Sequence, residues 1–141
     1  MKIGSAVPPP KAEGVKNKRP QLAIDQVFKT LRSGLKIYVE RSGDGPKVVK
    51  GSQVKVHYDG WLAEDYSKFD SSRDKRRPFE FELGAGKVIK GWEEGIEGLR
   101  AGSKIQLIIP AKLAYGKAGV PSMGIPEDAE LIFKVEVLKV T

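Results

Sequence analysis

The chain has 141 residues, a formal net charge of +7 and no cysteine, and 40% of its residues are hydrophobic. This length suffices for one domain with its own core plus an appendage. The lack of cysteine excludes disulfides, thiol chemistry and sulfur-ligated zinc, and the single histidine, His57, excludes a multi-histidine metal site. We therefore expect neither a metal nor a cofactor.

No stretch approaches the roughly 18 apolar residues of a membrane span, and Met1 to Ser5 are not followed by an apolar signal core. We therefore expect a cytoplasmic protein without membrane contact. The positive charge is concentrated at the start, where residues 1–33 carry seven basic and two acidic side chains. This basic segment favours a solubilising arm, with binding to nucleic acid or to an acidic partner as the alternative.

Residues 1–20, with Pro8-Pro9-Pro10 and scattered lysine and glycine, are predicted to be disordered. A helix is predicted over residues 21–33, with Pro20 at its start and Gly34 at its end. Its apolar stripe consists of Leu22, Ile24, Val27, Phe28 and Leu31. The helix docks on its own domain in one interpretation, and in the other it dimerises or enters a partner's groove. We expect a monomer.

From residue 35 the hydrophobic period becomes two, which is typical of strands. A first strand is predicted over residues 35–39, and Ser42 to Pro46 end it. A second strand is predicted over residues 53–62, with Val54, Val56 and Tyr58 on its inner face. This alternation places His57 on the solvent side, where it is not expected to act as a catalyst.

Residues 68–78 are predicted to form a polar loop, in which Asp70, as a residue that bonds nearby backbone groups, has a turn role. Alternating Phe79, Phe81 and Leu83 predict the next half-buried strand. A short helix is then predicted over residues 88–99, with Trp92, Ile96 and Leu99 on one face. Two interior glycines weaken this helix, so its apolar face must be wrapped by the strands.

Two more strands are predicted over residues 104–109 and 131–138, separated by a long loop at 111–128. Structureless loops of this length in compact domains are usually functional. The expected fold is α+β, an antiparallel five- to six-stranded half-barrel sheet around one short helix, with an N-terminal extension that contains a helix.

The residues offer no nucleophile–base pair, metal cluster or phosphate-binding loop. What remains is an excess of aromatic side chains at inward-facing or loop-anchoring positions, namely Tyr58, Phe69, Phe79, Phe81, Trp92, Tyr115 and Phe133. Taken singly, each is typical of a core, and Phe81 most of all. The core interpretation is weaker for Trp92, because the start of a short helix is a poor place to bury an indole completely. It is weakest for Tyr115, because its hydroxyl lies in a glycine-flanked loop and needs a partner.

Six ordered blocks resemble the FKBP-type peptidyl-prolyl isomerases. The blocks are His57-Tyr58-Asp59-Gly60, Phe69-Asp70-Ser71-Ser72, Pro78-Phe79-Glu80-Phe81, Gly84 to Gly95, Ala114-Tyr115-Gly116 and Ile125-Pro126. The resemblance covers residues 34–141, which we expect to form the isomerase domain. It implies a half-barrel around the helix, an apolar pocket, proline-containing polypeptides as substrates, and macrolides such as tacrolimus and rapamycin as ligands. The alternative is a non-catalytic binding module of the same fold.

The resemblance also implies roles for individual residues. By this resemblance, Trp92 is expected to form the floor of the pocket. The walls are expected to be Tyr58, Phe69, Phe79, Val88, Ile89 and Phe133. The Ile89 backbone N–H and the Tyr115 hydroxyl are similar to the family's donors to ligand carbonyls. Asp70 is expected at the rim, hydrogen-bonded to the ligand or to Tyr58, and Ile125 is expected to be an apolar contact. The set implied as catalytic is Tyr58, Asp70, Trp92, Tyr115 and Phe133.

The sequence departs from the family pattern at two places besides its N-terminal 33 residues. Lys75 stands where many members have arginine, and is expected to loosen the surroundings of Asp70 because lysine lacks the planar fork. Val120 replaces a frequent histidine, and the segment from Pro121 to Ile125 is one residue longer than in many members. Substrate preference that depends on this loop is therefore expected to differ.

Overall fold

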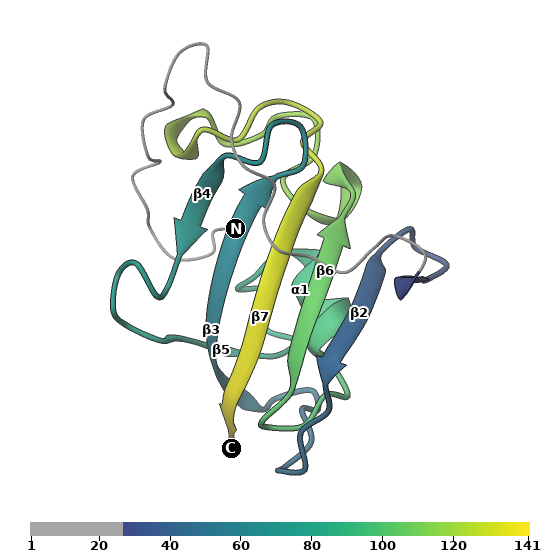
Figure 1. Cartoon of the computed structure of the whole chain (residues 1–141), viewed down its shortest axis with the longest axis vertical. Coiled ribbons are helices and arrows are strands. Elements are labelled where there is room, and N and C mark those ends of the chain that lie inside the picture. Colours follow the sequence, from purple (N-terminus) through teal and green to yellow (C-terminus); the bar gives the residue numbers. More distant parts are fainter. Residues whose placement is uncertain (1–26) are drawn as a thin grey trace.

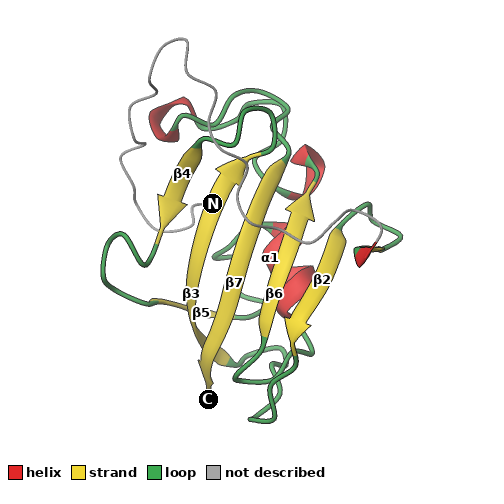
Figure 2. Ribbon diagram, in the orientation of Figure 1, coloured by secondary structure: helices red, strands yellow, loops and turns green. Residues whose placement is uncertain are grey.

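The computed structural model describes residues 27–141, which form one antiparallel sheet with a short helix against it (Figure 1). The strands run in the order β1-β2-β6-β7-β3-β4, and β5 also pairs with β3. Their bounds are β1 Lys29–Thr30, β2 Lys36–Arg41, β3 Gln53–Leu62, β4 Lys68–Ser71, β5 Phe79–Glu82, β6 Lys104–Ile109 and β7 Leu131–Val140. The helices are α1 (Lys90–Ile96) and two 3-10 turns, η2 (Ala111–Leu113) and η3 (Pro121–Met123). Figure 2 shows α1 covering one face of the sheet.

The two longest strands, β3 and β7, lie side by side in the middle of the sheet. Along each of them buried and more exposed residues alternate, as expected when one face is packed and the other is solvated. The pairing continues past the end of β7, where Gln53 and Thr141 exchange two backbone hydrogen bonds of 2.8 and 2.9 Å. Helix α1 packs on the same inner face of the sheet, with its glycines over β6 and its Trp92 ring against Tyr58 of β3 and Phe133 of β7.

Helix α1 is shorter than the predicted span of residues 88–99. Ile89 and Glu97, which flank it, have extended backbones, and Gly98 has a φ of 88°, a left-handed conformation that favours glycine. Within the helix Gly91 and Gly95 face the sheet, and a Cβ on Gly91 would lie 2.6 Å from Cγ2 of Ile109. The glycines that weaken the isolated helix therefore let it approach β6 closely.

The prediction of a helix over residues 21–33 is wrong for the part that the structure describes. Lys29 and Thr30 form β1, which pairs with β2 through Lys29↔Ile37 and Thr30↔Lys36. A tight turn joins the two strands, in which the Leu31 N–H donates to Leu35 and the Gly34 N–H donates to Leu31. Pairing with the edge of a preformed sheet satisfies more backbone groups than a helical turn that ends at Gly34. Residues 21–26 and the predicted disordered segment 1–20 lie outside the described residues.

Two further boundaries differ from the prediction. Because β1 belongs to the sheet and the Phe28 ring packs at 5.9 Å from that of Tyr38, the folded unit begins before residue 34. Lys68 to Ser71, predicted as part of a polar loop, form β4 and pair with β3. This strand is short and its residues are largely polar, so hydrophobic alternation could not reveal it. The sheet accordingly has seven strands in place of the expected five or six.

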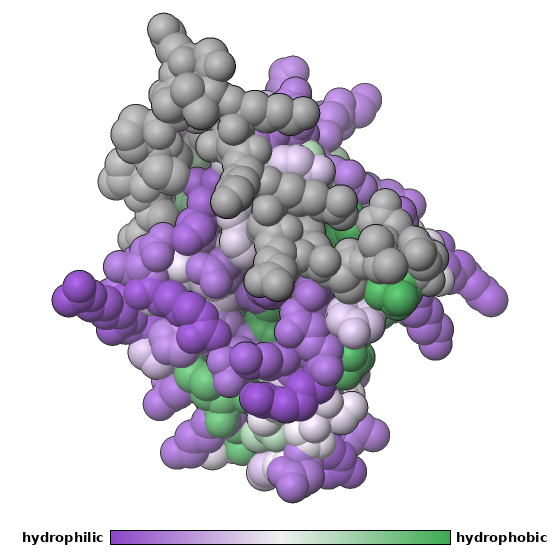
Figure 3. All heavy atoms as spheres, viewed as in Figure 1, coloured by the Kyte–Doolittle hydropathy of each residue, from purple (hydrophilic) through white to green (hydrophobic). Residues whose placement is uncertain are grey.

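The face of the molecule seen in Figure 3 is mostly hydrophilic, with small hydrophobic areas between charged side chains. Large hydrophobic side chains that remain exposed are few and separate in the described residues, namely Val27, Val39, Val49 and Leu138. Within residues 27–141 no helix has the length and apolar character needed to cross a membrane.

Candidate functional site

Six aromatic rings pack together between the inner face of the sheet and α1. We call this group, Tyr58, Phe69, Phe79, Phe81, Trp92 and Phe133, the aromatic cluster. Neighbouring ring centroids are 5.0 to 6.3 Å apart, and most pairs are tilted or edge-to-face, the arrangements that aromatic rings prefer. Five of the six rings were predicted as site residues, and they come from four strands and the helix.

Trp92 is the centre of the aromatic cluster. Its ring touches those of Tyr58, Phe79, Phe81 and Phe133, and its side chain is fully buried. The indole Nε1–H is buried with no hydrogen-bond acceptor among the described residues. A buried donor without an acceptor is unfavourable. An unbonded indole N–H such as that of Trp92 is therefore unusual in a side chain whose only role is packing.

The polar edge of the aromatic cluster is the Tyr58–Asp70 pair. The Tyr58 hydroxyl donates a 2.6 Å hydrogen bond to Oδ2 of Asp70, as the family resemblance implied. The other oxygen, Oδ1, accepts from the Ser71 N–H at 2.9 Å and contacts Nζ of Lys75 at 2.9 Å. Lys75 therefore reaches Asp70 directly, through one carboxylate oxygen.

This arrangement has a clear electrostatic consequence for Tyr58. Burial raises the pKa of its phenol far above the ordinary value, and the hydrogen bond to Asp70 and the negative charge of that carboxylate raise the pKa further. The nearby Tyr115 contributes in the same direction. Tyr58 therefore stays a neutral donor, and the Tyr115 side chain lies close enough to be felt electrostatically.

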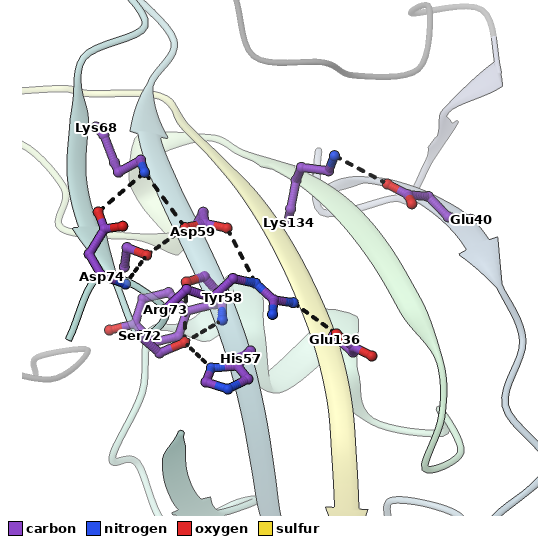
Figure 4. Close-up of polar contacts among 11 residues, drawn as sticks. Glu40, His57, Tyr58, Asp59, Lys68, Ser72, Arg73, Asp74, Lys134 and Glu136 are labelled. Carbon is purple, nitrogen blue, oxygen red and sulfur yellow. Dashed lines mark hydrogen bonds and ion pairs between the residues drawn. The ribbon is translucent and has the colours of Figure 1, made fainter. Parts of the chain in front are cut away.

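Ser72 holds β3 and the loop after β4 together. Its Oγ accepts a 2.7 Å hydrogen bond from the Tyr58 N–H and lies 2.9 Å from Nδ1 of His57 (Figure 4). His57 is half-buried on the outer face of the sheet, so the alternation argument placed it correctly, on the side away from the aromatic cluster. Its contact with Ser72 is a structural one.

The remaining predicted site residues border the aromatic cluster. Val88 and Ile89 are buried directly before α1, Ile125 is buried in the long loop, and the half-buried Tyr115 packs against the same core. The Ile89 carbonyl accepts from Trp92 and Glu93, whereas its N–H donates to no described residue. The backbones of Val120 and Ile125 exchange two hydrogen bonds. Val120, which differs from the family pattern, therefore belongs to the turn that holds Ile125 in place.

Two hollows help to locate the binding surface. One, of about 510 Å³, is lined by Ala118, Pro121, Gly124, Ile125, Pro126 and Glu127, and so adjoins a predicted site residue. The other, of about 270 Å³, lies on the outer face of the sheet and is lined mainly by charged side chains, among them Glu40, Asp59 and Lys104. The sheet separates the second hollow from the aromatic cluster, so we assign it no part in the site.

The charged residues of the outer face form a network of ion pairs (Figure 4). Arg73 bonds Glu136 at 2.8 Å and lies 3.8 Å from Asp59, and Lys68 lies 3.2 Å from Asp74. The hydrogen bond from Arg73 is the main reason why the pKa of Glu136 is lowered. No three potential metal ligands come together anywhere in residues 27–141.

Two residues of the site have roles that the sequence did not reveal. Phe81 was assigned to the core, yet its ring is 5.8 Å from those of both Phe79 and Trp92. Gly60 was noted only as part of a motif. A Cβ at Gly60 would lie 2.7 Å from the Phe133 ring and 2.9 Å from the Phe69 ring, so glycine makes room for both. The signal in the sequence was that Gly60 belongs to the block His57-Tyr58-Asp59-Gly60. The reason why glycine is needed there is visible only in the structure.

Comparison with protein-family models gives one match, to the family described as FKBP-type peptidyl-prolyl cis-trans isomerase, over residues 45–138. An FK506-binding protein of Neisseria meningitidis is 50% identical over 107 residues, which are 76% of this chain and 96% of the relative. The peptidyl-prolyl cis-trans isomerase FPR2 of Saccharomyces cerevisiae is 50% identical over 94 residues, which are 67% of this chain and 69% of the relative.

Solved structures show the same similarity. FkpA from Escherichia coli superposes with a TM-score of 0.76 at 42% identity, and the match covers 83% of this chain and 53% of FkpA. AtFKBP13 superposes with a TM-score of 0.74 at 38% identity, and the match covers 81% of this chain and 98% of that one. The open sheet and its single α-helix are therefore shared with both.

Proposed function

The chain belongs to the FKBP-type peptidyl-prolyl cis-trans isomerase family, and we propose that it accelerates X-Pro rotation without covalent chemistry, by holding the twisted amide against the aromatic cluster. The observation that carries this mechanism is the position of Trp92, fully buried among four other rings with its Nε1–H unbonded within the described residues. Such surroundings suit an apolar ring such as that of proline. They offer no nucleophile to the amide.

Rotation about the X-Pro bond can be accelerated by moving the amide from water into an apolar site. The barrier to rotation about a peptide bond is about 18–20 kcal/mol, because rotation breaks the resonance of the amide. The planar amide is more polar than the twisted one, so water stabilises the ground state more than the transition state. A dry aromatic site reverses this preference, which is differential binding of the transition state. An acceleration of about 10⁴ to 10⁵ requires roughly 5–7 kcal/mol.

Each residue of the site has a proposed part. Trp92 is the floor beneath the proline ring, and the walls are Tyr58, Phe69, Phe79, Val88, Ile89, Ile125 and Phe133. The Ile89 N–H, which bonds no described residue, and the Tyr115 hydroxyl donate to substrate carbonyls. Asp70 keeps Tyr58 oriented through their 2.6 Å hydrogen bond. The donors act on the carbonyls flanking the twisted bond, and the rings exclude water from it.

The same site is proposed to bind macrolides of the tacrolimus and rapamycin type. Relatives at about 50% identity are named FK506-binding proteins, and the residues implied as ligand contacts are all present and border one cluster. None of the aromatic positions carries a polar or charged replacement. A macrolide that covers the rings is expected to exclude a proline-containing substrate.

The experiment that tests the function is isomerisation of a short Leu-Pro peptide, measured with and without rapamycin. Acceleration that the drug inhibits supports both the mechanism and the macrolide site. Acceleration that is insensitive to the drug contradicts the macrolide proposal alone. If the folded protein binds the drug but does not accelerate exchange, the aromatic cluster is a binding site only and the catalytic proposal fails.

A further inference from the structure

The segments that carry the site residues are strongly basic. Three segments, residues 72–78, 83–90 and 110–120, lead into or contain Phe79, Val88, Ile89 and Tyr115, and together they hold eight lysines and arginines against a single acid, Asp74. All eight basic residues are exposed. These eight cations therefore lie in segments that hold site residues and are separate from the basic N-terminal segment, while acids also lie beside the site at Glu80 and Glu82 of β5 and at Glu93 and Glu94 of α1.

Two of the eight cations already have partners. Arg73 is paired with Glu136 and Asp59 on the outer face of the sheet, and Lys75 is paired with Asp70. The other six make no ion pair with any described acid, and we call them the rim cations: Arg76, Arg77, Lys87, Lys90, Lys112 and Lys117. Within residues 27–141 their charge is therefore not neutralised by an ion pair.

The rim cations come in three pairs, and each pair is fixed to a different part of the site. Arg76 and Arg77 lie at the end of the loop that runs from β4 to β5 and immediately precede Pro78 and Phe79 (Figure 1). Lys87 and Lys90 flank the buried Val88 and Ile89. Lys112 and Lys117 flank Tyr115. Each of these three segments thus combines a pair of rim cations with residues assigned to the site.

The positive surface is bounded on one side. The segment after Ile125 carries Glu127, Asp128 and Glu130 and no basic residue, and it shares a hollow of about 330 Å³ with Glu64. Acids also lie next to Phe79 and Trp92, at Glu80 and Glu93, so cations and acids occupy different segments around the site. A field of this kind attracts carboxylates to one part of the site and repels them from another.

We propose that the preferred substrates are polypeptides with acidic side chains within about three residues of the proline, and that the rim cations select them. The inference rests on the proposed isomerase function and adds a substrate class to it. A residue three positions from the proline lies up to about 10 Å away in an extended chain, which is within a Debye length at 0.1 M salt. A nucleic acid is the other polyanion that such a surface attracts, and the test separates the two.

The test uses the full chain and three peptides that share an Ala-Leu-Pro-Phe core, flanked on both sides by two Glu, two Gln or two Lys residues. At about 20 mM salt we expect kcat/KM for the Glu peptide to exceed that for the Gln peptide about fivefold, and the Lys peptide to be the poorest. At about 0.5 M salt the ratio should fall below about two. Equal kcat/KM for the Glu and Gln peptides at low salt overturns the proposal.

The variants locate the effect. R76Q/R77Q, K87Q/K90Q and K112Q/K117Q each remove two rim charges, and at least one should lower the Glu-to-Gln ratio while leaving kcat/KM for the Gln peptide within about twofold. The matched control K55Q/K139Q removes the same charge from register partners on the face of the sheet opposite α1, and should leave the ratio unchanged. A ratio that falls equally in the control contradicts a role for the rim.

Failure of this inference can be told from failure of the function. If the wild-type chain accelerates the Gln peptide without preferring the Glu peptide, only the substrate class is wrong. If it accelerates none of the three, the isomerase proposal is wrong and this inference falls with it. If a single-stranded oligonucleotide binds through the rim cations while the peptides show no preference, the surface serves nucleic acid and the proposal is overturned.

Discussion

The hydroxyl of Tyr58 donates a 2.6 Å hydrogen bond to a carboxylate oxygen of Asp70, and both residues are almost completely buried, with 1% and 3% of their surface exposed. The two side chains lie across the β3–β4 pairing, so the bond joins the polar edge of the aromatic cluster to the edge strand of the sheet. A hydrogen bond to a charged, buried acceptor is one of the stronger kinds. It therefore both stabilises the fold and orients the ring.

Replacing Tyr58 by Phe tests the energetic role of this bond. We expect the free energy of unfolding to fall by about 1.5–3 kcal/mol, because the buried Asp70 carboxylate loses the Tyr58 donor and keeps only the Ser71 N–H and Lys75 among residues 27–141. The control is Tyr38→Phe, which removes a hydroxyl that forms no hydrogen bond within residues 27–141 and should change stability by less than about 0.5 kcal/mol. Equal losses in the two variants, measured by urea unfolding, would contradict this role of the bond.

The raised pKa of Tyr58 predicts how the protein responds to alkali. An unfolded tyrosine ionises near pH 10, whereas burial and Asp70 keep the folded Tyr58 neutral well above that pH. Its contribution to stability is therefore complete below about pH 10 and is lost as the pH rises further. Ultraviolet titration should show the same tyrosinate signal for native wild type and native Tyr58→Phe up to about pH 11, and a smaller one for the variant once both are unfolded.

Trp92 should matter more for activity than for stability. Trp92→Phe keeps an aromatic ring and removes an indole N–H without an acceptor, so we expect a loss of stability below about 2 kcal/mol. The change in the floor of the site should nevertheless lower kcat/KM at least tenfold, or about 1.4 kcal/mol in the barrier. Tyr115→Phe, which removes a proposed donor, should also lower kcat/KM. Full activity in both variants would refute the assignment of the site.

The lowered pKa of Glu136 predicts an acid-dependent contribution to stability. Because the folded carboxyl ionises at a lower pH than the unfolded one, this contribution is present at neutral pH and is lost as the pH falls through the folded pKa. Arg73→Gln should therefore reduce stability at pH 7 by less than about 1 kcal/mol, since Arg73 is half exposed, and should have no effect near pH 2. The control is Arg76→Gln, which removes from the same loop a cation that forms no ion pair within residues 27–141, and it should change stability at neither pH.

The close approach of α1 to the sheet can be tested at Gly91. Alanine improves helix propensity by about 1 kcal/mol, yet a Cβ here would lie 2.6 Å from Ile109, so Gly91→Ala should destabilise the protein by about 1–3 kcal/mol. In an Ile109→Ala background the clash is absent, and the same substitution should be neutral or stabilising. A double-mutant cycle measures this difference. Additive effects would show that the contact with Ile109 is not the cause.

Much of this architecture could be predicted from hydrophobic period. The strands at 53–62, 79–83, 104–109 and 131–138 alternate clearly, and each lies within two residues of the observed bounds. Helix α1 was predicted too long because Val88 and Leu99 fit its apolar stripe, although Gly98 ends it in a left-handed conformation. Hydrophobic period does not predict β1 and β4, since these short strands are largely polar and form by pairing with β2 and β3.

For the site too, some features could be predicted from the sequence and others are visible only in the structure. The resemblance to a family supplied the aromatic residues, and the structure brings those rings together around Trp92. It could not supply the contact of Lys75 with Asp70, because a lysine reaches a carboxylate through a flexible stem whose direction depends on the loop. Nor could it explain Gly60, whose missing Cβ matters only beside the rings of Phe69 and Phe133.

The central position of β7 has a consequence for how the protein is made. Strands β3 and β6 both pair with β7, which comprises residues 131–140, and Gln53 closes the sheet by bonding Thr141. On the ribosome neither strand can find this partner until nearly all of the described chain has been synthesised. Proteins dominated by such distant pairings fold slowly, in milliseconds to seconds. The nascent chain therefore emerges with the inner faces of β3 and β6 uncovered, and this exposed hydrophobic surface favours aggregation until β7 has been synthesised.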